Sequence, residues 1–92
     1  MKLQKIQLDN EAWPDLFISE SRGGFYGLYL ELKKDRNEVF NKNGSMSKAN
    51  QIVKQSKTLQ KLREKGYMAV FSWGINYSLD VIANYLDGKY QR

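Results

Sequence analysis

The sequence contains no cysteine and no histidine among its 92 residues. The absence of cysteine excludes disulfide scaffolds and thiol nucleophiles, and the two absences together exclude zinc sites built from Cys and His. Ser-His-Asp triads and enzymes that rely on a histidine base are excluded as well. Any bound metal must therefore be held by oxygen atoms, the ligands that Mg²⁺, Mn²⁺ and Ca²⁺ prefer. Acid–base chemistry must come from Asp, Glu, Lys or Tyr.

Long hydrophobic runs are also missing. The N-terminal stretch Met1–Lys5 lacks the apolar segment of a signal peptide, and no run approaches the roughly 20 residues that span a membrane. We therefore expect no membrane partner and a cytoplasmic location. The length predicts one domain over residues 1–92, with an N-terminal arm 1–12, a core 13–87 and a tail 88–92. The tail is expected to be a flexible end that touches DNA.

Positive charge is concentrated in one part of the chain. The net charge is +5, but residues 33–65 hold ten Lys and Arg against three Asp and Glu, a charge of +7, which leaves −2 for the remainder. The net charge alone fits a polyanionic partner and an ordinary soluble surface about equally. The candidate phosphate contacts in this segment are Lys34, Arg36, Lys42 and Lys48.

Hydrophobic periodicity predicts a β-hairpin followed by alternating helices and strands. Residues 15–20 and 25–33 alternate between apolar and polar, and the turn signal 21–24 separates them. Residues 34–46 read as a polar loop, and residues 67–71 as a strand buried on both faces. Leu3, Ile6 and Leu8 suggest a further N-terminal strand.

Two helices complete the pattern. Apolar residues at helical spacing follow Ser47, a plausible N-cap, and Gly66 is a plausible residue just past the end. The expected stripe is Ala49, Ile52, Val53, Leu59 and Leu62. After a turn at Trp73-Gly74, a second helix of about ten residues ends before Gly88. The predicted fold class is α/β, a small mixed sheet with flanking helices in the order (β)ββ-α-β-α.

The hairpin register brings two carboxylates together. If paired residue numbers sum to 46, Leu16 faces Leu30 on one face, whereas Asp15 faces Glu31 on the other, with Lys33 one pair away. A slip of one residue would bury the carboxylates, so hydrophobicity favours this register or one shifted by two. The pair beside a lysine makes a sensible Mg²⁺ site. The alternative is an exposed Glu-x-Lys strand surface, which the short pattern alone favours.

Gln55 adds a polar group within the apolar stripe of the first helix. Its position falls between Leu59 and Leu62 on a helical wheel. A buried amide without partners costs about 1–3 kcal/mol. Gln55 is therefore either a glutamine at the stripe edge that reaches solvent or an amide that points across the sheet at the carboxylate–lysine cluster.

Taken together, these pieces resemble the PD-(D/E)XK nuclease core, and in detail the virus-type replication-repair nuclease (VRR-NUC) family. The resemblance covers about residues 12–87 and depends on the spacing of the pieces together. They are Trp13-Pro14-Asp15-Leu16-Phe17-Ile18, Gly23-Gly24-Phe25-Tyr26-Gly27-Leu28-Tyr29-Leu30-Glu31-Leu32-Lys33, Gln55, Leu62-Arg63-Glu64-Lys65-Gly66-Tyr67, Trp73-Gly74 and Asn84-Tyr85-Leu86.

The resemblance implies a DNA endonuclease that depends on Mg²⁺ or Mn²⁺. By the family pattern, Asp15, Glu31 and the backbone carbonyl of Leu32 bind the metal, Lys33 is the catalytic lysine, and Gln55 is the helix glutamine of the site. Stand-alone viral members resemble Holliday-junction resolvases that act as homodimers. The implied partners are branched DNA and a second copy of the chain, in the host cytoplasm if the protein is viral.

The sequence departs from the family pattern at its N-terminus. Family members usually carry an N-terminal helix with a Glu near the metal, whereas the 13 residues before Pro14 do not read as a helix, and Glu11 does not align convincingly. This departure keeps open a catalytically inactive DNA-binding or dimerisation module on the same fold. A nuclease that nicks flaps or single-stranded ends is the other alternative.

Overall fold

The protein is built on a three-stranded mixed sheet, described here for residues 13–92 of a computed structural model. The elements are β1 (Leu16–Ile18), β2 (Leu28–Lys33), the 3₁₀ helix η2 (Arg36–Glu38), α1 (Asn50–Glu64), β3 (Met68–Trp73) and α2 (Ile75–Leu86). The sheet order is β1-β2-β3, so β2 is central. The predicted α/β class and element order are confirmed, except that the strand expected around residues 3–8 lies outside the described residues.

The strand register matches the prediction. Strands β1 and β2 are antiparallel, with Leu16 opposite Leu30 and Ile18 opposite Leu28, so paired numbers sum to 46. Strands β2 and β3 are parallel, with Glu31 opposite Phe71 and Lys33 opposite Trp73. A parallel pair needs a long crossover, and α1 supplies it. Strand β3 continues through Trp73, beyond the predicted end at residue 71, because its backbone keeps pairing with β2.

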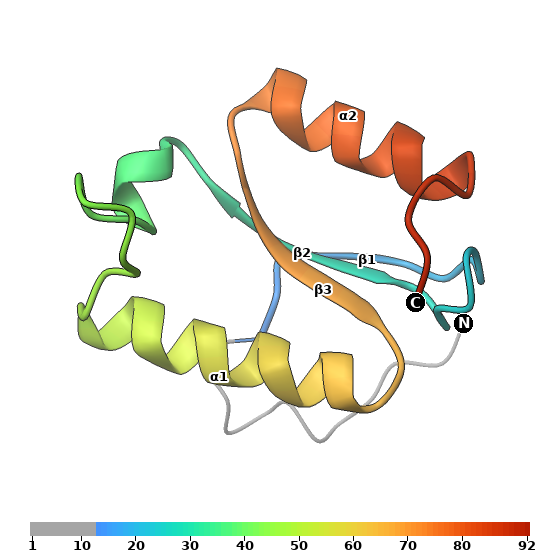
Figure 1. The fold of residues 1–92 in the computed structure, drawn as a ribbon, viewed down its shortest axis with the longest axis horizontal. Helices are drawn as coiled ribbons and strands as arrows, with labels where there is room; N and C mark the ends of the chain where they lie inside the picture. The colour runs from blue at the N-terminus through green and yellow to red at the C-terminus, as the bar shows by residue number, and fades with distance from the viewer. Residues whose placement is uncertain (1–12) are drawn as a thin grey trace.

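Helices cover both faces of the sheet, as Figure 1 shows, with α1 on one side and α2 on the other. On the α1 side, the fully or nearly buried core includes Tyr29, Ile52, Leu59 and Leu62. On the α2 side, the core consists of Leu28, Leu30, Val81 and Tyr85. Strand β2 is therefore buried on both faces, so a charged side chain on it leaves water unless it has a compensating partner.

Helix α1 begins later than the sequence predicts. Its N-cap is Ala49, and the proposed cap Ser47 is wrong. The backbone N–H of Ser47 donates to the carbonyl of Val39 at 2.7 Å, which holds this residue in the preceding loop. The predicted end is confirmed, because Gly66 follows the C-cap Lys65 with φ of 103°. Of the predicted stripe, Ile52, Leu59 and Leu62 are buried, whereas Ala49 and Val53 are exposed.

The loop after β2 is better ordered than its polar sequence indicates. Asp35 caps η2 through a capping box with Glu38. Val39 is fully buried and joins the core on the α1 side. A β-bridge between Phe40 and Met46 closes the loop. The basic residues of this loop are therefore carried on an anchored segment beside the end of β2.

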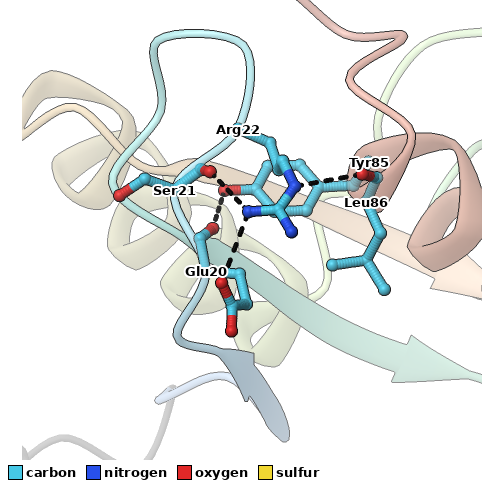
Figure 2. A network of polar contacts seen from close by, with 5 residues as sticks. All are labelled: Glu20, Ser21, Arg22, Tyr85 and Leu86. Carbon is cyan, nitrogen blue, oxygen red and sulfur yellow. Dashed lines mark hydrogen bonds and ion pairs between the residues drawn. The ribbon is translucent and has the colours of Figure 1, made fainter.

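A network of polar contacts fastens the hairpin turn to the end of α2 (Figure 2). Arg22 Nε donates to the Leu86 carbonyl at 3.0 Å, and Tyr85 Oη donates to the Glu20 carbonyl at 2.6 Å. Arg22 Nη1 also donates to the Ser21 carbonyl at 2.8 Å and lies 3.3 Å from Glu20 Oε2. This hairpin–helix network (Glu20, Ser21, Arg22, Tyr85 and Leu86) ties β1 and β2 to the last helix.

The C-terminal residues are packed, contrary to the expected flexible tail. The Arg92 N–H donates to the Gly23 carbonyl at 2.8 Å, and Tyr90 packs against the α2-side core. A Cβ on Gly23 would lie 1.9 Å from the Tyr90 carbonyl oxygen, so glycine is required for this approach. No helix among residues 13–92 is long and apolar enough to cross a membrane.

Candidate active site

Glu31 is a buried carboxylate near the end of the central strand β2. It lies on β2, is only 4% exposed, and its side chain is on the face that α1 covers, like Tyr29 two residues earlier. One carboxylate oxygen, Oε1, is buried with no hydrogen-bond partner among the described residues. A buried charge is costly unless it is paired or bound to a metal. The position of Glu31 therefore needs an explanation beyond packing.

Gln55 reaches Glu31 from α1. Its Nε2 donates a hydrogen bond to Glu31 Oε2 at 3.2 Å, and the residue is 4% exposed. The burial excludes a glutamine at the stripe edge that reaches solvent. The other end of the amide, Oε1, is buried without a partner in the described residues. Two unpaired acceptor oxygens, from Glu31 and Gln55, thus lie in one buried cluster.

Lys33 completes the polar cluster on β2. Its Nζ lies 3.9 Å from Glu31 Oε2, and the side chains of Lys33 and Glu31 are 9% and 6% exposed, respectively. Residues two apart on a strand share a face, which explains why the lysine and the carboxylate meet. This burial contradicts the exposed Glu-x-Lys surface that was the alternative interpretation of the motif.

Asp15 stands just before β1, opposite the end of β2. Its Oδ2 accepts a hydrogen bond from the Leu32 N–H at 2.9 Å. Because the N–H and C=O of one residue in an extended strand point to the same side, the Leu32 carbonyl also points toward Asp15. Asp15 itself is exposed to solvent. The two carboxylates thus differ in environment, since Asp15 is exposed to solvent and Glu31 is buried.

The electrostatics of the cluster raise the pKa of Glu31 to about 8 from its ordinary value of 4.5. Burial is the main cause, and the neighbouring Asp15 carboxyl adds to it, whereas the positive charge of Lys33 opposes it. The positive charge of one lysine is therefore too little to keep Glu31 ionised at neutral pH. A further cation at the cluster would restore the ionised form.

The donor set suits a hard divalent cation. Mg²⁺ is usually held by one or two carboxylates together with other oxygens and several waters. Asp15, Glu31 and the Leu32 carbonyl are the oxygens that could hold such an ion, and the unpaired Oε1 of Glu31 is an available ligand atom. Within residues 13–92 there is no cluster of three Asp or Glu side chains, so a third acidic ligand is absent from this part of the chain. Glu11 lies outside the described residues.

The four predicted phosphate contacts lie on the segment that joins β2 to α1. Lys34, Arg36, Lys42 and Lys48 are all exposed. The backbone N–H of Lys34 donates to Glu38 at 2.8 Å, which fixes the start of the loop. A depression of about 460 Å³ at the end of β2 is lined in part by Lys33, Lys34, Gly74 and Ile75. This depression lies between the end of β2 and the start of α2, and it does not include Asp15 or Glu31. Contact of the four basic side chains with phosphate stays a prediction.

A series of aromatic contacts, called here the ring ladder (Arg36, Phe40, Trp73 and Tyr77), supports the loop after β2 and was not predicted from the sequence. The Arg36 guanidinium lies 4.7 Å from the centroid of the Phe40 ring, which packs edge-on against Trp73 at 5.9 Å. Trp73 stacks on Tyr77 at 4.8 Å. These residues come from η2, the following loop, β3 and α2, so no local sequence pattern could have revealed their contact. The ladder positions the basic loop relative to Lys33, whose strand partner is Trp73.

Comparison with solved structures shows a likeness over most of the chain. The chain is similar to a solved structure called "VRR_NUC domain protein", with 30% sequence identity and a TM-score of 0.66. The match covers 86% of this chain and 56% of that chain, so the present sequence spans little more than half of its neighbour's length. No family model matches the chain, and no curated protein does. The shared fold and identity support the resemblance to the VRR-NUC family.

Proposed function

We propose that the protein is a VRR-NUC nuclease that cuts branched DNA and depends on Mg²⁺ or Mn²⁺. The observation that carries this proposal is the buried Glu31, whose Oε1 lacks a partner while Gln55 and Lys33 contact its Oε2. A carboxylate held ready in this way suits a metal ligand and has no evident structural role. The similarity to a VRR_NUC domain protein supports the same function.

Each side chain of the cluster has a role in this proposal. Asp15, Glu31 and the Leu32 carbonyl would hold the metal, which supplies charge neutralisation at the phosphate and activates water for hydrolysis. Gln55 orients Glu31 through its 3.2 Å hydrogen bond. Lys33 places a positive charge beside the carboxylates and would stabilise negative charge that develops on the phosphate oxygens. Water would attack phosphorus in line and lose a proton, the P–O bond to the leaving oxygen would break, and that oxygen would take up a proton.

In this proposal, the basic residues between β2 and α1 contact the DNA. Lys34, Arg36, Lys42 and Lys48 are exposed and belong to the segment whose charge is +7. Phosphate contacts of this kind bind without reading sequence. The preference for branches would then come from shape, and four-way (Holliday) junctions are the substrate that we propose.

We also propose that the active form is a homodimer, since two symmetric cuts need two sites related by a two-fold axis. An apolar stripe on α2 supports this, because Ile75 is 78% exposed and Leu79 is 58% exposed. The helix carries no Lys or Arg, so this face does not suit DNA phosphates. Aromatic residues are enriched at protein interfaces. Most of those in this chain give no support for a dimer, however, because they pack against its own cores; these are Trp13, Phe25, Phe40, Trp73 and Tyr90.

One experiment separates this function from its alternatives. The protein is incubated with a four-way junction, a flap and a linear duplex, each with Mg²⁺ or with EDTA. The proposal expects cleavage of the junction only with the metal. Preferential nicking of the flap would favour the flap nuclease. Binding of all three DNAs without cleavage in either condition would show an inactive DNA-binding module.

A further inference from the structure

A second basic surface lies at the opposite end of the sheet from the carboxylates. It is a depression of about 440 Å³ along the start of β3, within the size range of pockets that hold small ligands. We call it the β3-edge site. Its lining includes three positive side chains, Arg63, Lys89 and Arg92, together with the rings of Tyr67 and Tyr90, and it includes no Asp or Glu.

The positive charges of this site are free to meet a ligand. Within residues 13–92, no carboxylate lies within ion-pair distance of Arg63, Lys89 or Arg92. Arg63 Nη1 donates to the Ala69 carbonyl at 2.6 Å, which fixes the guanidinium at the sheet edge. A guanidinium has five N–H donors, so most of them remain after this bond. The site is therefore a cationic surface in which Arg63 is held in place by its bond to the sheet edge.

Tyr26 adds an exposed ring beside these charges. It is 61% exposed, and its ring lies edge-on to Tyr67, which lines the site, at 6.0 Å between centroids. A Cβ on Gly66 would lie 2.6 Å from Tyr26 Cε2 and 3.3 Å from Arg92 Nη1. The tyrosine ring and the Arg92 guanidinium thus rest on the same glycine. A ring next to a guanidinium is a platform on which an unpaired base can stack.

Two features disfavour a second copy of the chain as the occupant. Arg63 occupies the Ala69 carbonyl at the free edge of the sheet, which hinders pairing with another strand. A two-fold contact would also bring like charges together, because both copies would present the same surface. A polyanion needs no strand pairing at this edge and brings charge of the opposite sign. The exposed aromatic ring favours a single nucleic acid strand, because the bases of a duplex are stacked on one another and are not available to the ring.

We infer that the β3-edge site binds a DNA strand that is unpaired at the branch point of the substrate, with phosphates on Arg63, Lys89 and Arg92 and a base on Tyr26. This inference rests on the proposed DNA substrate. The two sites lie along one helix, since Gln55 and Arg63 are eight residues apart on α1. At 1.5 Å per residue that is about 12 Å, or about three to four nucleotides of a stacked strand.

The test measures DNA binding without cleavage. Fluorescence polarisation in EDTA compares a blunt duplex with the same duplex carrying a tail of about six thymidines, long enough to span the two sites. The wild type is expected to bind the tailed DNA more tightly by about fivefold or more, a change that stacking of one base can supply. The preference should disappear in Tyr26→Ala and in the double variant Lys89→Gln with Arg92→Gln.

Matched controls keep the result specific. Tyr26→Phe retains the ring and should keep the preference. Lys57→Gln removes one charge from an exposed position of α1 that does not line the site, and it should also keep the preference. Equal binding of blunt and tailed DNA by the wild type would overturn the inference, as would a preference that survives Tyr26→Ala and the double variant.

The outcomes also separate this inference from the proposed function. Metal-dependent junction cleavage with no preference for tailed DNA would overturn the β3-edge site and leave the nuclease intact. Failure to bind any DNA would overturn both. A lower mass in sedimentation for the double variant, with DNA binding unchanged, would assign this surface to contact between copies and would overturn the inference.

Discussion

Gln55 Nε2 on α1 donates a hydrogen bond to Glu31 Oε2 on β2 at 3.2 Å, and both residues are 4% exposed. This bond crosses from helix to sheet inside the core, where an apolar pair would be the ordinary choice. Replacement of the glutamine by an apolar residue of similar shape should therefore lower both the cleavage rate and the stability.

We expect Gln55→Met to lower the cleavage rate by about tenfold or more, as loss of a group that orients a metal ligand does. Stability should also fall, by about 1–3 kcal/mol, because the substitution leaves the buried Glu31 Oε2 without its hydrogen-bond donor. Cleavage kinetics and thermal unfolding in EDTA measure the two effects. A variant that is destabilised and fully active would show that Gln55 is only a packing residue.

Loss of either carboxylate is expected to abolish cleavage and to preserve DNA binding. Asp15→Asn and Glu31→Gln keep the side-chain shapes but remove the negative charges that a divalent cation needs. Cleavage assays, binding in EDTA and circular dichroism together test this prediction. Wild-type cleavage rates in either variant would remove that residue from the site.

Lys33→Ala should reduce the rate by about 10²-fold or more at saturating DNA, the usual size for a positioned electrostatic group, with little loss of affinity. Lys34→Ala is the matched control, because Lys34 is the next residue and is exposed. Its affinity should fall while its rate at saturation holds. The opposite pattern, with affinity lost in Lys33→Ala and the rate kept, would make Lys33 a phosphate contact only.

The metal-free protein should become less stable as the pH rises. The folded-state pKa of Glu31 is about 8, above its ordinary value of 4.5, so the folded state holds this proton more tightly than the unfolded state. The contribution of Glu31 to stability is therefore complete below pH 4.5 and is lost as the pH rises toward 8. Unfolding temperatures measured in EDTA across this range should fall for the wild type.

Glu31→Gln is the control for this pH dependence, since it cannot ionise. Its unfolding temperature should change less over the same range and should exceed that of the wild type at the alkaline end. Added Mg²⁺ should raise the unfolding temperature of the wild type and not that of the variant, because a ligand stabilises the state that binds it. Parallel pH profiles for the two proteins would contradict the buried titration of Glu31.

The apolar stripe of α2 makes the homodimer testable. Ile75→Lys and Leu79→Glu place charges on the two most exposed apolar side chains of this helix. Sedimentation equilibrium should show about twice 10.8 kDa for the wild type and 10.8 kDa for the variants. Asn76→Lys, at a neighbouring exposed position, is the control for charge alone. A wild-type mass of 10.8 kDa with junction cleavage would show that one copy is sufficient.

The carboxylate cluster was predictable because its geometry follows from strand alternation. Once Leu16 and Leu30 are paired, Asp15 meets the end of β2 and Glu31 and Lys33 share a face. Gln55 was recognisable as a polar residue in an apolar stripe. Each of these inferences uses the hydrophobic periodicity of a single strand or helix, which can be read directly from the sequence.

The parts that sequence reasoning did not predict depend on contacts between distant segments. Ser47 fails as a cap because its N–H is bound by Val39 in the preceding loop. The packed tail depends on the close approach of Arg92 to Gly23, and the ring ladder depends on the meeting of Phe40 with Trp73. Tertiary pairing overrides local propensity in these places, and one sequence carries no direct record of it.

The hairpin–helix network joins residues that are 64 and 65 positions apart along the chain. Contacts of such long separation require closure of a long loop before they contribute stability, so they slow folding. A chain emerging from the ribosome has no α2 against which to close its first hairpin. A chain that lacks α2 therefore also lacks the contacts that hold this hairpin, whose register brings Asp15 to the end of β2.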